Sequence, residues 1–309
     1  MADFYTLDDL RNWSDRAGAL APPARLAVIG DPIGHSRSPQ MHNPALAACG
    51  IDAQYVRVQV PQGCVAEAFA LFAQHGFLGV NITIPHKFEA LEAVHHVDPL
   101  AKQLGAVNTL VIREGGQLHG YNTDGPGFLR SVREAFGVEV RDLRVLILGA
   151  GGGAGRAVAV QCAMEGCWRL VLANRTEAKA AVVAKELRSL IAQPSPNRDI
   201  STVIWDDKHL YAELENIDLI VNATSVGMKL DDPPLLPPSG LLPHHLVLDM
   251  VYRPGGGAPL VQDARRAGGR AVDGLTLLLH QGAISFEHWF NRPAPVEVMR
   301  QGLQATVAE

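Results

Sequence analysis

The chain has 309 residues, of which 47% are hydrophobic and 19% charged, and its 27 lysines and arginines against 32 aspartates and glutamates give a net charge of −5. This composition excludes a disordered chain and a collagen-like repeat, and the length predicts about two domains. The mildly acidic balance excludes a general attraction for nucleic acid or anionic lipid.

Cysteine content and the first residues indicate where the protein works. The four cysteines, at positions 49, 64, 162 and 167, are too few for a disulfide scaffold, and no two of them form a C-x-x-C pair. The N-terminal residues carry acidic groups and lack the apolar core of a signal peptide, and no stretch reaches the ~18 apolar residues of a membrane helix. We therefore expect a soluble cytoplasmic protein with reduced thiols.

The first 120 or so residues alternate between strand and helix patterns. A short helix is predicted over 6–16, with Thr6 as its cap and Asp9 three residues on. The predicted strands span 25–30, 55–60, 78–84, 108–112 and 117–122, and two further helices are predicted over 39–50 and 65–75. This alternation predicts an α/β layer structure.

A second α/β pattern begins near residue 143. The predicted strands span 145–148, 169–174, 201–205, 217–224 and 246–251, and the predicted helices span 154–166, 177–192, 275–290 and 295–304. A loop is predicted at 193–199, and five prolines within 231–245 exclude regular structure throughout that segment.

A glycine-rich turn lies between the strand 145–148 and the helix that follows. The residues Gly149-Ala-Gly-Gly-Gly-Ala154 fit the pattern G-x-G-x-x-G/A in the strand–turn–helix context that gives this pattern its meaning. Gly149 permits the tight turn, Gly151 lets the backbone approach a pyrophosphate, and a small third residue allows close helix packing. The helix N-terminus then attracts the anion, which predicts a dinucleotide cofactor.

The residues that follow the next strand favour NADP over NAD. A carboxylate at this point would bind the ribose hydroxyls of NAD, but the sequence has Asn174-Arg175-Thr176, with Lys179 one turn later. A guanidinium can pair with the additional ribose phosphate of NADP through two hydrogen bonds.

Three segments of the first half carry polar residues that suit a small polar substrate. Ser36 and Ser38 lie between a strand and a helix, where two hydroxyls and nearby N–H groups can bind a carboxylate. Asn81 and Thr83, in a strand pattern, share a face and are followed by Lys87. The third segment comprises G-A-V-N-T at 105–109 and N-T-D-G at 122–125.

Taken together, these segments resemble the shikimate dehydrogenase family, from about Gly30 to about Trp289. The matching motifs are G-D-P-I-G-H-S-R-S-P with H-N at 30–43, N-I-T-I-P-H-K at 81–87, G-A-V-N-T at 105–109, N-T-D-G at 122–125, N-R-T at 174–176, N-A-T-S-V-G-M at 222–228, D-M-V-Y at 249–252, D-G-L at 273–275 and Q-G-A at 281–283. The glycine turn is one residue longer than the family's common form, which leaves its phosphate contacts open between 151 and 155.

The resemblance implies a reversible reduction of 3-dehydroshikimate to shikimate by NADPH, and it implies roles for individual residues. Lys87 and Asp124 match the catalytic pair, in which an ammonium held by a carboxylate supplies the proton that the forming alkoxide needs. The residues implied to bind or line the substrate are Ser36, Ser38, Asn81, Thr83, Asn108, Asp124, Tyr252 and Gln281. Those implied to bind the cofactor are Gly149, Ala150, Gly151, Gly152, Gly153, Ala154, Asn174, Arg175, Thr176, Lys179, Thr224, Met250 and Gly274.

The expected architecture is α/β, with two α/β domains. An N-terminal substrate-binding domain comprises 1–123 plus 275–309, so the C-terminal helices return to it, and a Rossmann-like NADP-binding domain comprises 124–274. A deep cleft between the two is expected to close on the substrate. We expect a monomer or homodimer, with no nucleic acid, membrane or metal partner, because no carboxylate or cysteine completes a metal site around His86, His95 and His96.

Two alternative functions remain open. A quinate/shikimate dehydrogenase that uses NAD is the nearest one, although the pair Ser36 and Ser38 favours shikimate over the bulkier quinate. A catalytically silent, cofactor-sensing regulator on the same fold is the other, although the sequence retains both Lys87 and Asp124. Another two-domain dehydrogenase, such as a methylenetetrahydrofolate enzyme, would lack the Ser-x-Ser and N-I-T-I-P-H-K motifs.

Overall fold

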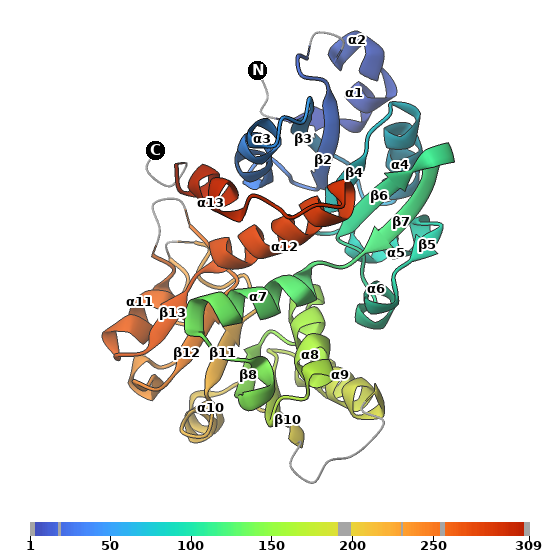
Figure 1. Cartoon of the computed structure of the whole chain (residues 1–309). Helices are drawn as coiled ribbons and strands as arrows, with labels where there is room; N and C mark the ends of the chain where they lie inside the picture. The colour runs from blue at the N-terminus through green and yellow to red at the C-terminus, as the bar shows by residue number, and fades with distance from the viewer. Residues whose placement is uncertain (1–3, 18–19, 191–198, 230, 254–256, 306–309) are drawn as a thin grey trace. The chain divides into compact units, whose positions relative to one another are not determined.

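The computed structural model describes residues 4–17, 20–190, 199–229, 231–253 and 257–305. The chain divides into two compact units, which are Met1–Thr123 with Leu279–Glu309 (unit 1) and Asp124–Leu278 (unit 2). Each unit has its own β-sheet with helices packed around it (Figure 1). The prediction of two α/β domains is therefore confirmed.

Unit 1 contains a mixed seven-stranded sheet in the order β1-β3-β2-β4-β6-β7-β5. The strands β1, β3, β2 and β4 are parallel, whereas β6 runs antiparallel to both β4 and β7. Its strands are β1 (Tyr5–Thr6), β2 (Ala24–Gly30), β3 (Gln54–Gln59), β4 (Gly79–Ile82), β5 (His96–Val97), β6 (Thr109–Arg113) and β7 (Gln117–Tyr121). Its helices are α1 (Leu7–Arg11), α2 (Trp13–Ala17), α3 (Ser38–Ala48), α4 (Val65–Gln74), α5 (Lys87–Ala93), α6 (Pro99–Leu104) and α13 (Val296–Ala305), with a 3-10 turn at Glu114–Gly116.

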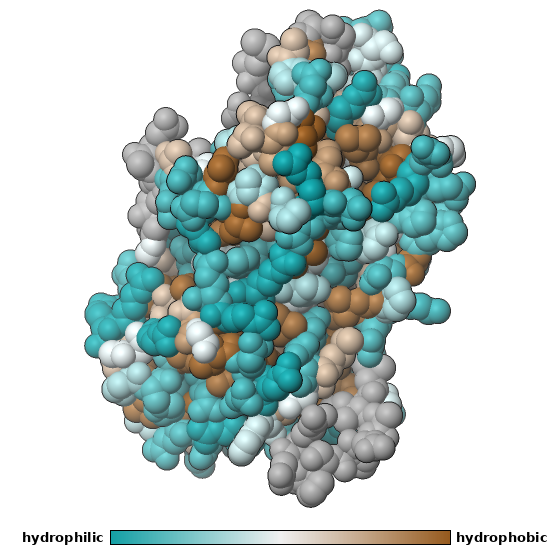
Figure 2. All heavy atoms as spheres, viewed as in Figure 1, coloured by the Kyte–Doolittle hydropathy of each residue, from teal (hydrophilic) through white to brown (hydrophobic). Residues whose placement is uncertain are grey.

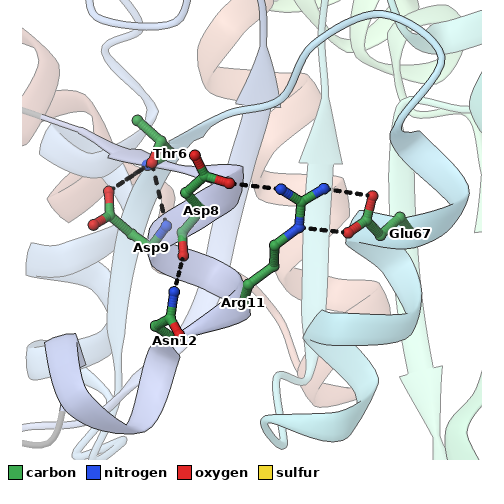
Figure 3. A network of polar contacts seen from close by, with 6 residues as sticks. All are labelled: Thr6, Asp8, Asp9, Arg11, Asn12 and Glu67. Carbon is green, nitrogen blue, oxygen red and sulfur yellow. Dashed lines mark hydrogen bonds and ion pairs between the residues drawn. The ribbon is translucent and has the colours of Figure 1, made fainter.

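The N-terminal segment extends the sheet of unit 1 and packs against α4. The Thr6 hydroxyl accepts a hydrogen bond from Asp9 N, and the Asp9 carboxylate accepts one from Thr6 N, which confirms the predicted cap. Arg11 donates two hydrogen bonds to Glu67 of α4 and one to Asp8 (Figure 3). The buried indole of Trp13 contacts the rings of Tyr5 and Phe77, so an apolar core underlies this exposed polar network.

The C-terminal helices return to unit 1, as predicted. Helix α12 (Gly274–Phe290) begins in unit 2 and ends in unit 1, where the indole of Trp289 donates a 2.9 Å hydrogen bond to the Leu110 carbonyl. Helix α13 packs closely on α3, since a Cβ added at Gly302 would lie 2.2 Å from the Gln40 carbonyl oxygen.

Unit 2 contains a six-stranded parallel sheet in the order β10-β9-β8-β11-β12-β13. Numbered within the unit, this order is 3-2-1-4-5-6, the Rossmann topology, with its switch point between β8 and β11. The strands are β8 (Arg144–Leu148), β9 (Arg169–Ala173), β10 (Asp199–Val203), β11 (Leu219–Asn222), β12 (Leu246–Asp249) and β13 (Arg270–Val272). The helices are α7 (Asp124–Phe136), α8 (Gly153–Glu165), α9 (Glu177–Leu190), α10 (Asp207–Leu214) and α11 (Pro259–Arg266), with 3-10 turns at Val140–Asp142 and Pro238–Gly240.

Several elements differ from the sequence prediction. Helix α7 was not predicted, because Gly125, Pro126 and Gly127 in its first turn mask the helical pattern. Helices α5, α6, α10 and α11 and the short strands β1, β5 and β13 were also missed. Strand β10 lies two residues before the predicted 201–205, since its register is set by pairing with β9. The predicted loop at 193–199 lies, up to residue 198, outside the described residues.

The surface is mostly hydrophilic on the face in Figure 2, with hydrophobic residues between the polar ones. Among the large hydrophobic side chains described as exposed, Ile84 and Trp168 have the largest exposed fractions, 73% and 62%. Ile84 precedes Lys87 by three residues and Phe88 follows it, at 54% exposed. Exposed apolar side chains therefore both precede and follow this lysine in the chain. No helix among the described residues is long and apolar enough to cross a bilayer.

Candidate functional site

The sheet topology of unit 1 brings the predicted substrate residues to one edge. Strands β2, β4 and β7 run in the same direction, and β6 runs opposite to β4 and β7. The segments after β2, β4 and β7 therefore lie at the same edge as the residues just before β6. These segments carry Ser36 and Ser38, Thr83 to Lys87, Asn122 to Thr123, and Asn108, respectively.

The two serines lie side by side at the start of α3. The Ser36 hydroxyl donates a 3.3 Å hydrogen bond to the Ser38 hydroxyl, which is only 4% exposed. Arg57, which sequence reasoning missed, fixes this loop from β3 by donating a 2.7 Å hydrogen bond from Nε to the Ser36 carbonyl. Two adjacent hydroxyls at the N-terminus of an eleven-residue helix suit a carboxylate group.

The two predicted residues Asn108 and Gln281 meet around Thr123. The Asn108 oxygen accepts a 2.8 Å hydrogen bond from Thr123 N, and its amide nitrogen donates to the Thr123 hydroxyl at 3.0 Å. The same hydroxyl lies 3.5 Å from Gln281 Oε1, on helix α12. Residues 158 positions apart in sequence thus form one polar cluster.

The Asn81 amide is engaged by other side chains of unit 1. It is 5% exposed, its oxygen accepts a 2.8 Å hydrogen bond from the Tyr55 hydroxyl, and its nitrogen donates to Ser285 at 2.9 Å. Thr83 lies just past the end of β4, and its main-chain N–H donates to Ile29 O at 2.9 Å. A Cβ added at Gly30 would lie 2.7 Å from the Thr83 methyl group, so the loop after β2 packs directly on Thr83.

The two predicted catalytic residues each begin a helix. Lys87 is the first residue of α5 and is partly buried, and its carbonyl accepts a 3.0 Å hydrogen bond from Val107 N. Asp124 is the first residue of α7 and of unit 2, and it follows Thr123 of the polar cluster directly in the chain. The convergence of the Lys87 amine and the Asp124 carboxylate on one substrate oxygen stays a prediction.

The glycine turn of unit 2 follows β8 and leads into α8. Gly149 has φ +89°, a conformation that glycine adopts readily, and its N–H donates to Ala173 O of β9 at 2.8 Å. A Cβ at Gly155 would lie 2.2 Å from the Gly149 carbonyl oxygen. The close contact between helix and turn therefore falls at Gly155, one residue after the predicted Ala154, because the turn is longer than the common motif.

The residues after β9 border this turn. The Asn174 side-chain oxygen accepts a 3.2 Å hydrogen bond from Gly151 N, and its amide nitrogen donates to Thr176 O at 2.9 Å. A Cβ at Gly151 would lie 2.5 Å from Lys179 Cβ. Arg175 and Lys179 are both exposed. This exposure suits side chains that pair with the phosphate of a ligand that binds from solvent. The turn residues Gly152 and Gly153 are exposed as well.

The remaining predicted cofactor residues also lie at the carboxyl ends of the parallel strands. Thr224, after β11, packs against Gly149, since a Cβ at that glycine would lie 2.7 Å from the Thr224 methyl group. Gly274 donates a hydrogen bond to Val251 O and borders the Met250 carbonyl and the Tyr252 ring. This edge of a Rossmann sheet is where dinucleotides bind, so the residues present fit such a group.

A buried carboxylate supports the loops after β11 and β12. Asp249 is fully buried, and its Oδ1 accepts hydrogen bonds from Asn222 Nδ2 at 2.8 Å and from Val251 N at 2.9 Å. Asn222 Oδ1 in turn accepts from the N–H and the hydroxyl of Thr224. Burial raises the pKa of Asp249 to about 7. In the sequence, only its place at the start of the D-M-V-Y motif could have indicated that Asp249 has this supporting role.

Within the described part of the chain, no group of three or more His, Cys, Asp or Glu residues is placed to hold a metal ion. The cysteines, all described, are free.

Comparison with known proteins assigns the family. The model of the shikimate dehydrogenase substrate binding domain matches residues 28–110, and that of the shikimate 5'-dehydrogenase C-terminal domain matches residues 274–304. A relative from Symbiobacterium thermophilum, named shikimate dehydrogenase (NADP(+)), is 42% identical over 94% of this chain and 97% of its own.

Solved structures agree with this assignment. The chain is similar to shikimate 5-dehydrogenase from Thermus thermophilus in complex with NADP(H) and shikimate, with a TM-score of 0.79 and 32% identity over 92% of this chain and 99% of that one. It is also similar to quinate dehydrogenase from Corynebacterium glutamicum in complex with NAD, with a TM-score of 0.78 and 29% identity over 91% and 98%. These similarities each extend over more than 90% of this chain. The chain belongs to the shikimate dehydrogenase family.

Proposed function

We propose that this protein is a shikimate dehydrogenase that reduces 3-dehydroshikimate to shikimate with NADPH and catalyses the reverse oxidation with NADP⁺. One observation supports this proposal most strongly. The edge of the unit 1 sheet gathers the Ser36–Ser38 pair, the Asn108–Thr123–Gln281 cluster and the segment that begins at Lys87. This set suits a ligand with a carboxylate and several hydroxyls on one small ring. The names of relatives over more than 90% of the chain support the same function.

The substrate carboxylate binds to the hydroxyls of Ser36 and Ser38. Both groups donate to it, and the N-terminus of α3 adds a favourable dipole. Asn108 and Gln281 bind ring hydroxyls, while Thr83 and Tyr252 line the pocket. Because each of these residues combines a donor and an acceptor, the site accepts hydroxyl groups, whereas a purely apolar ring would leave them unpaired.

The protein's part in the chemistry is proton transfer at the substrate oxygen. Bound NADPH supplies the hydride that adds to the carbonyl carbon. Lys87 donates a proton to the carbonyl oxygen as negative charge develops there, and it accepts this proton again in the oxidation. Asp124 orients the Lys87 ammonium and accepts a hydrogen bond from the neighbouring substrate hydroxyl.

The cofactor binds at the carboxyl edge of the unit 2 sheet. The main chain of Gly149 to Ala154 and the N-terminus of α8 hold the pyrophosphate, with Gly155 permitting the close packing. Asn174, Arg175, Thr176 and Lys179 hold the adenosine ribose and its phosphate, and the guanidinium of Arg175 gives the preference for NADP. Thr224, Met250 and Gly274 border the nicotinamide.

The two predicted domains divide these roles, and the second boundary between them lies four residues before the boundary of the two compact units at Leu278 and Leu279. Residues 1–123 with 275–309 bind the substrate, residues 124–274 bind the cofactor, and Asp124 stands at the point where the chain passes from one to the other. We place the protein in the cytoplasm, in agreement with its four free cysteines, as a monomer or homodimer that needs no metal.

The decisive test is a comparison of kcat/KM for shikimate and quinate, each with NADP⁺ and NAD⁺. The absorbance of the reduced cofactor measures the reaction rate. We expect shikimate with NADP⁺ to give the highest kcat/KM of the four combinations. A higher value for quinate with NAD⁺ would establish the quinate dehydrogenase alternative, the activity named for the similar Corynebacterium enzyme. Binding of NADPH without turnover of either substrate would establish a regulator.

A further inference from the structure

His86 precedes Lys87 directly in the chain, and its side chain is 0% exposed. The residue stands at the N-cap position of α5, but its side chain does not cap this helix. Instead, imidazole Nε2 lies 2.7 Å from the carbonyl oxygen of Val60, the residue just after β3. Because a carbonyl oxygen can only accept, Nε2 carries a proton and donates it to Val60.

Main-chain hydrogen bonds hold the same part of the backbone. His86 N donates to Thr83 O at 2.9 Å, and Ala90 N donates to His86 O at 2.8 Å. The Lys87 carbonyl accepts a 3.0 Å hydrogen bond from Val107 N. These bonds fix the path of the chain into α5, whereas the imidazole bond ties this path to the end of β3.

A second side chain in the first turn of α5 binds the segment that joins β3 to α4. Glu89 Oε2 accepts from Gly63 N at 3.1 Å, and Glu89 Oε1 accepts from Val65 N at 2.9 Å. The carboxylate thus satisfies main-chain N–H groups at the start of α4. His86 Nδ1 lies 3.9 Å from Glu89 Oε2. Side chains on both sides of Lys87 therefore hold this turn against one neighbouring segment.

Val60 is itself bonded to the strand next to β3. Its N–H donates to the Gly30 carbonyl at 3.3 Å, where β2 ends. The segment after Gly30 carries the two serines of the proposed carboxylate site. Two hydrogen bonds, from His86 to Val60 and from Val60 to Gly30, thus connect the start of α5 to the segment proposed to bind the other end of the substrate.

The position of the Lys87 amine depends on where its backbone is held, because the lysine stem is long and flexible. Misplacement of a reacting group by about 1 Å can lower a rate about 10²-fold. A buried hydrogen bond is costly to leave unmade, so the imidazole holds the Val60 carbonyl in one place. Loss of this bond would let the first turn of α5 shift relative to β3, although the Lys87 amine is still present.

We propose that His86 is a positioning residue for Lys87, because its buried hydrogen bond to the Val60 carbonyl holds the first turn of α5 in place relative to the ends of β2 and β3. This inference rests on the proposed function, in which Lys87 is the proton donor. It adds a buried residue that acts through Lys87 and not on the substrate itself.

The first test uses His86→Phe, which keeps a flat ring and removes the donor. We expect the rate constant for hydride transfer from shikimate to NADP⁺ to fall about 10- to 100-fold. The absorbance of NADPH in single turnovers measures this rate constant. Calorimetry should give a Kd for shikimate and a Kd for NADPH within about threefold of the wild type, because the residues proposed to bind them are unchanged.

Two amide variants test the hydrogen bond itself. The amide nitrogen of glutamine can take the place of Nε2, whereas that of asparagine takes the place of Nδ1 and does not reach the Val60 oxygen. We expect His86→Gln to transfer hydride within about threefold of the wild-type rate, and His86→Asn to lose as much as His86→Phe. If His86→Phe does not fold, this pair of variants decides the question.

The matched control is His245→Phe in unit 2. His245 is also 0% exposed, and its Nε2 lies 2.8 Å from the Leu214 carbonyl oxygen. This variant measures the cost of losing a buried imidazole–carbonyl bond far along the chain from Lys87. It should lower the free energy of unfolding and leave the rate constant for hydride transfer unchanged.

A double-mutant cycle tests the route through Lys87. Adding His86→Phe to Lys87→Ala should lower the rate constant for hydride transfer by less than about twofold, because the amine that His86 positions is already gone. Additive losses in the double mutant would show that His86 does not act through Lys87.

Other outcomes separate this inference from the proposed function. A wild-type rate in His86→Phe, beside a Lys87→Ala variant that has lost turnover, would overturn the inference and leave the proposed function standing. Equal losses in His86→Gln and His86→Asn would show that the bond to Val60 is not the cause. A wild-type protein that does not oxidise shikimate, or a Lys87→Ala variant with the wild-type rate, would overturn the proposed function and this inference together.

Discussion

The main-chain carbonyl of Lys87 accepts a 3.0 Å hydrogen bond from Val107 N. The next residue, Asn108, binds the main chain of Thr123 through its side chain, and Thr123 precedes Asp124. Two hydrogen bonds, one at each of two neighbouring residues, thus link the backbone at Lys87 to the backbone of Thr123. This linkage fixes the start of α5 relative to the last residue of unit 1 before Asp124.

Replacement of Lys87 by alanine removes the proposed proton donor. We expect Lys87→Ala to lower kcat for shikimate oxidation by about 10²- to 10⁴-fold, the range typical of general acid–base catalysis. Because Lys87 lies in unit 1 and the cofactor residues lie in unit 2, the Kd for NADPH, measured by fluorescence titration, should stay within about twofold of the wild type. Substantial residual turnover would remove Lys87 from the mechanism.

Gly155 is expected to tolerate no side chain. A Cβ there would lie 2.2 Å from the Gly149 carbonyl oxygen, so Gly155→Ala must displace the glycine turn or the start of α8. We expect a loss of about 1–3 kcal/mol in the free energy of unfolding and a raised KM for NADP⁺. In the matched control Gly152→Ala, the new Cβ would lie 3.4 Å from the same oxygen, and the φ of Gly152 is −85°. Denaturant unfolding should therefore show a smaller loss in the free energy of unfolding. Equal losses in both variants would contradict the packing argument.

Arg175 is expected to set the cofactor preference. The charge-assisted hydrogen bonds of a guanidinium to a phosphate contribute about 1.5–3 kcal/mol, so Arg175→Ala should raise KM for NADP⁺ by about 10- to 100-fold. The KM for NAD⁺ should change little, because NAD⁺ lacks this phosphate. Steady-state kinetics with both cofactors measure the two values, and a parallel rise in both would assign Arg175 to a general electrostatic role.

Asp249 should make stability depend on pH. Burial raises its pKa from 3.8 to about 7, so the folded protein keeps a proton that the unfolded chain releases from about pH 4 upwards. The folded state binds more protons in this range, and stability therefore falls as pH rises from about 4 to 7 and levels off above it. The total change is on the order of 4 kcal/mol.

Asp249→Asn keeps an oxygen that can accept from Asn222 and Val251 and removes the titration. We expect the variant to lack this fall in stability and to be more stable than the wild type at pH 8. Urea unfolding of both proteins at pH 5, 6, 7 and 8 provides the comparison, in which parallel pH profiles would refute a raised pKa in the folded state.

The N-terminal segment should be stabilised by its apolar core more than by its ion pairs. Trp13 is 7% exposed and contacts the rings of Tyr5 and Phe77, so Trp13→Ala should lower the free energy of unfolding by about 3–5 kcal/mol. Arg11, although it bonds to both Glu67 and Asp8 (Figure 3), is solvent-exposed, and Arg11→Ala should unfold at nearly the wild-type denaturant concentration. A larger loss in the free energy of unfolding for Arg11→Ala than for Trp13→Ala would contradict the dominance of the apolar core.

Local chemistry determined much of this protein. The glycine turn after β8, the Thr6 cap with Asp9 and the alternation of strands and helices could be predicted because each depends on residues close in sequence. The same is true of Ser36 and Ser38, which are two residues apart and could face one ligand. Helix α7 escaped prediction because its first turn contains two glycines and a proline, and only packing overcomes their low helical propensity.

The tertiary structure decided which distant residues act together. Tyr55, Asn81 and Ser285 form one hydrogen-bonded chain although the last two are 204 positions apart, and Gly155 rather than Ala154 meets the Gly149 carbonyl. Such contacts depend on strand order and helix return, which no short sequence pattern encodes. The sequence by itself thus determined the family, the cofactor turn and the reactive groups, whereas folding determined their burial, their partners and the pKa of Asp249, because desolvation and hydrogen bonding arise only when remote segments pack together.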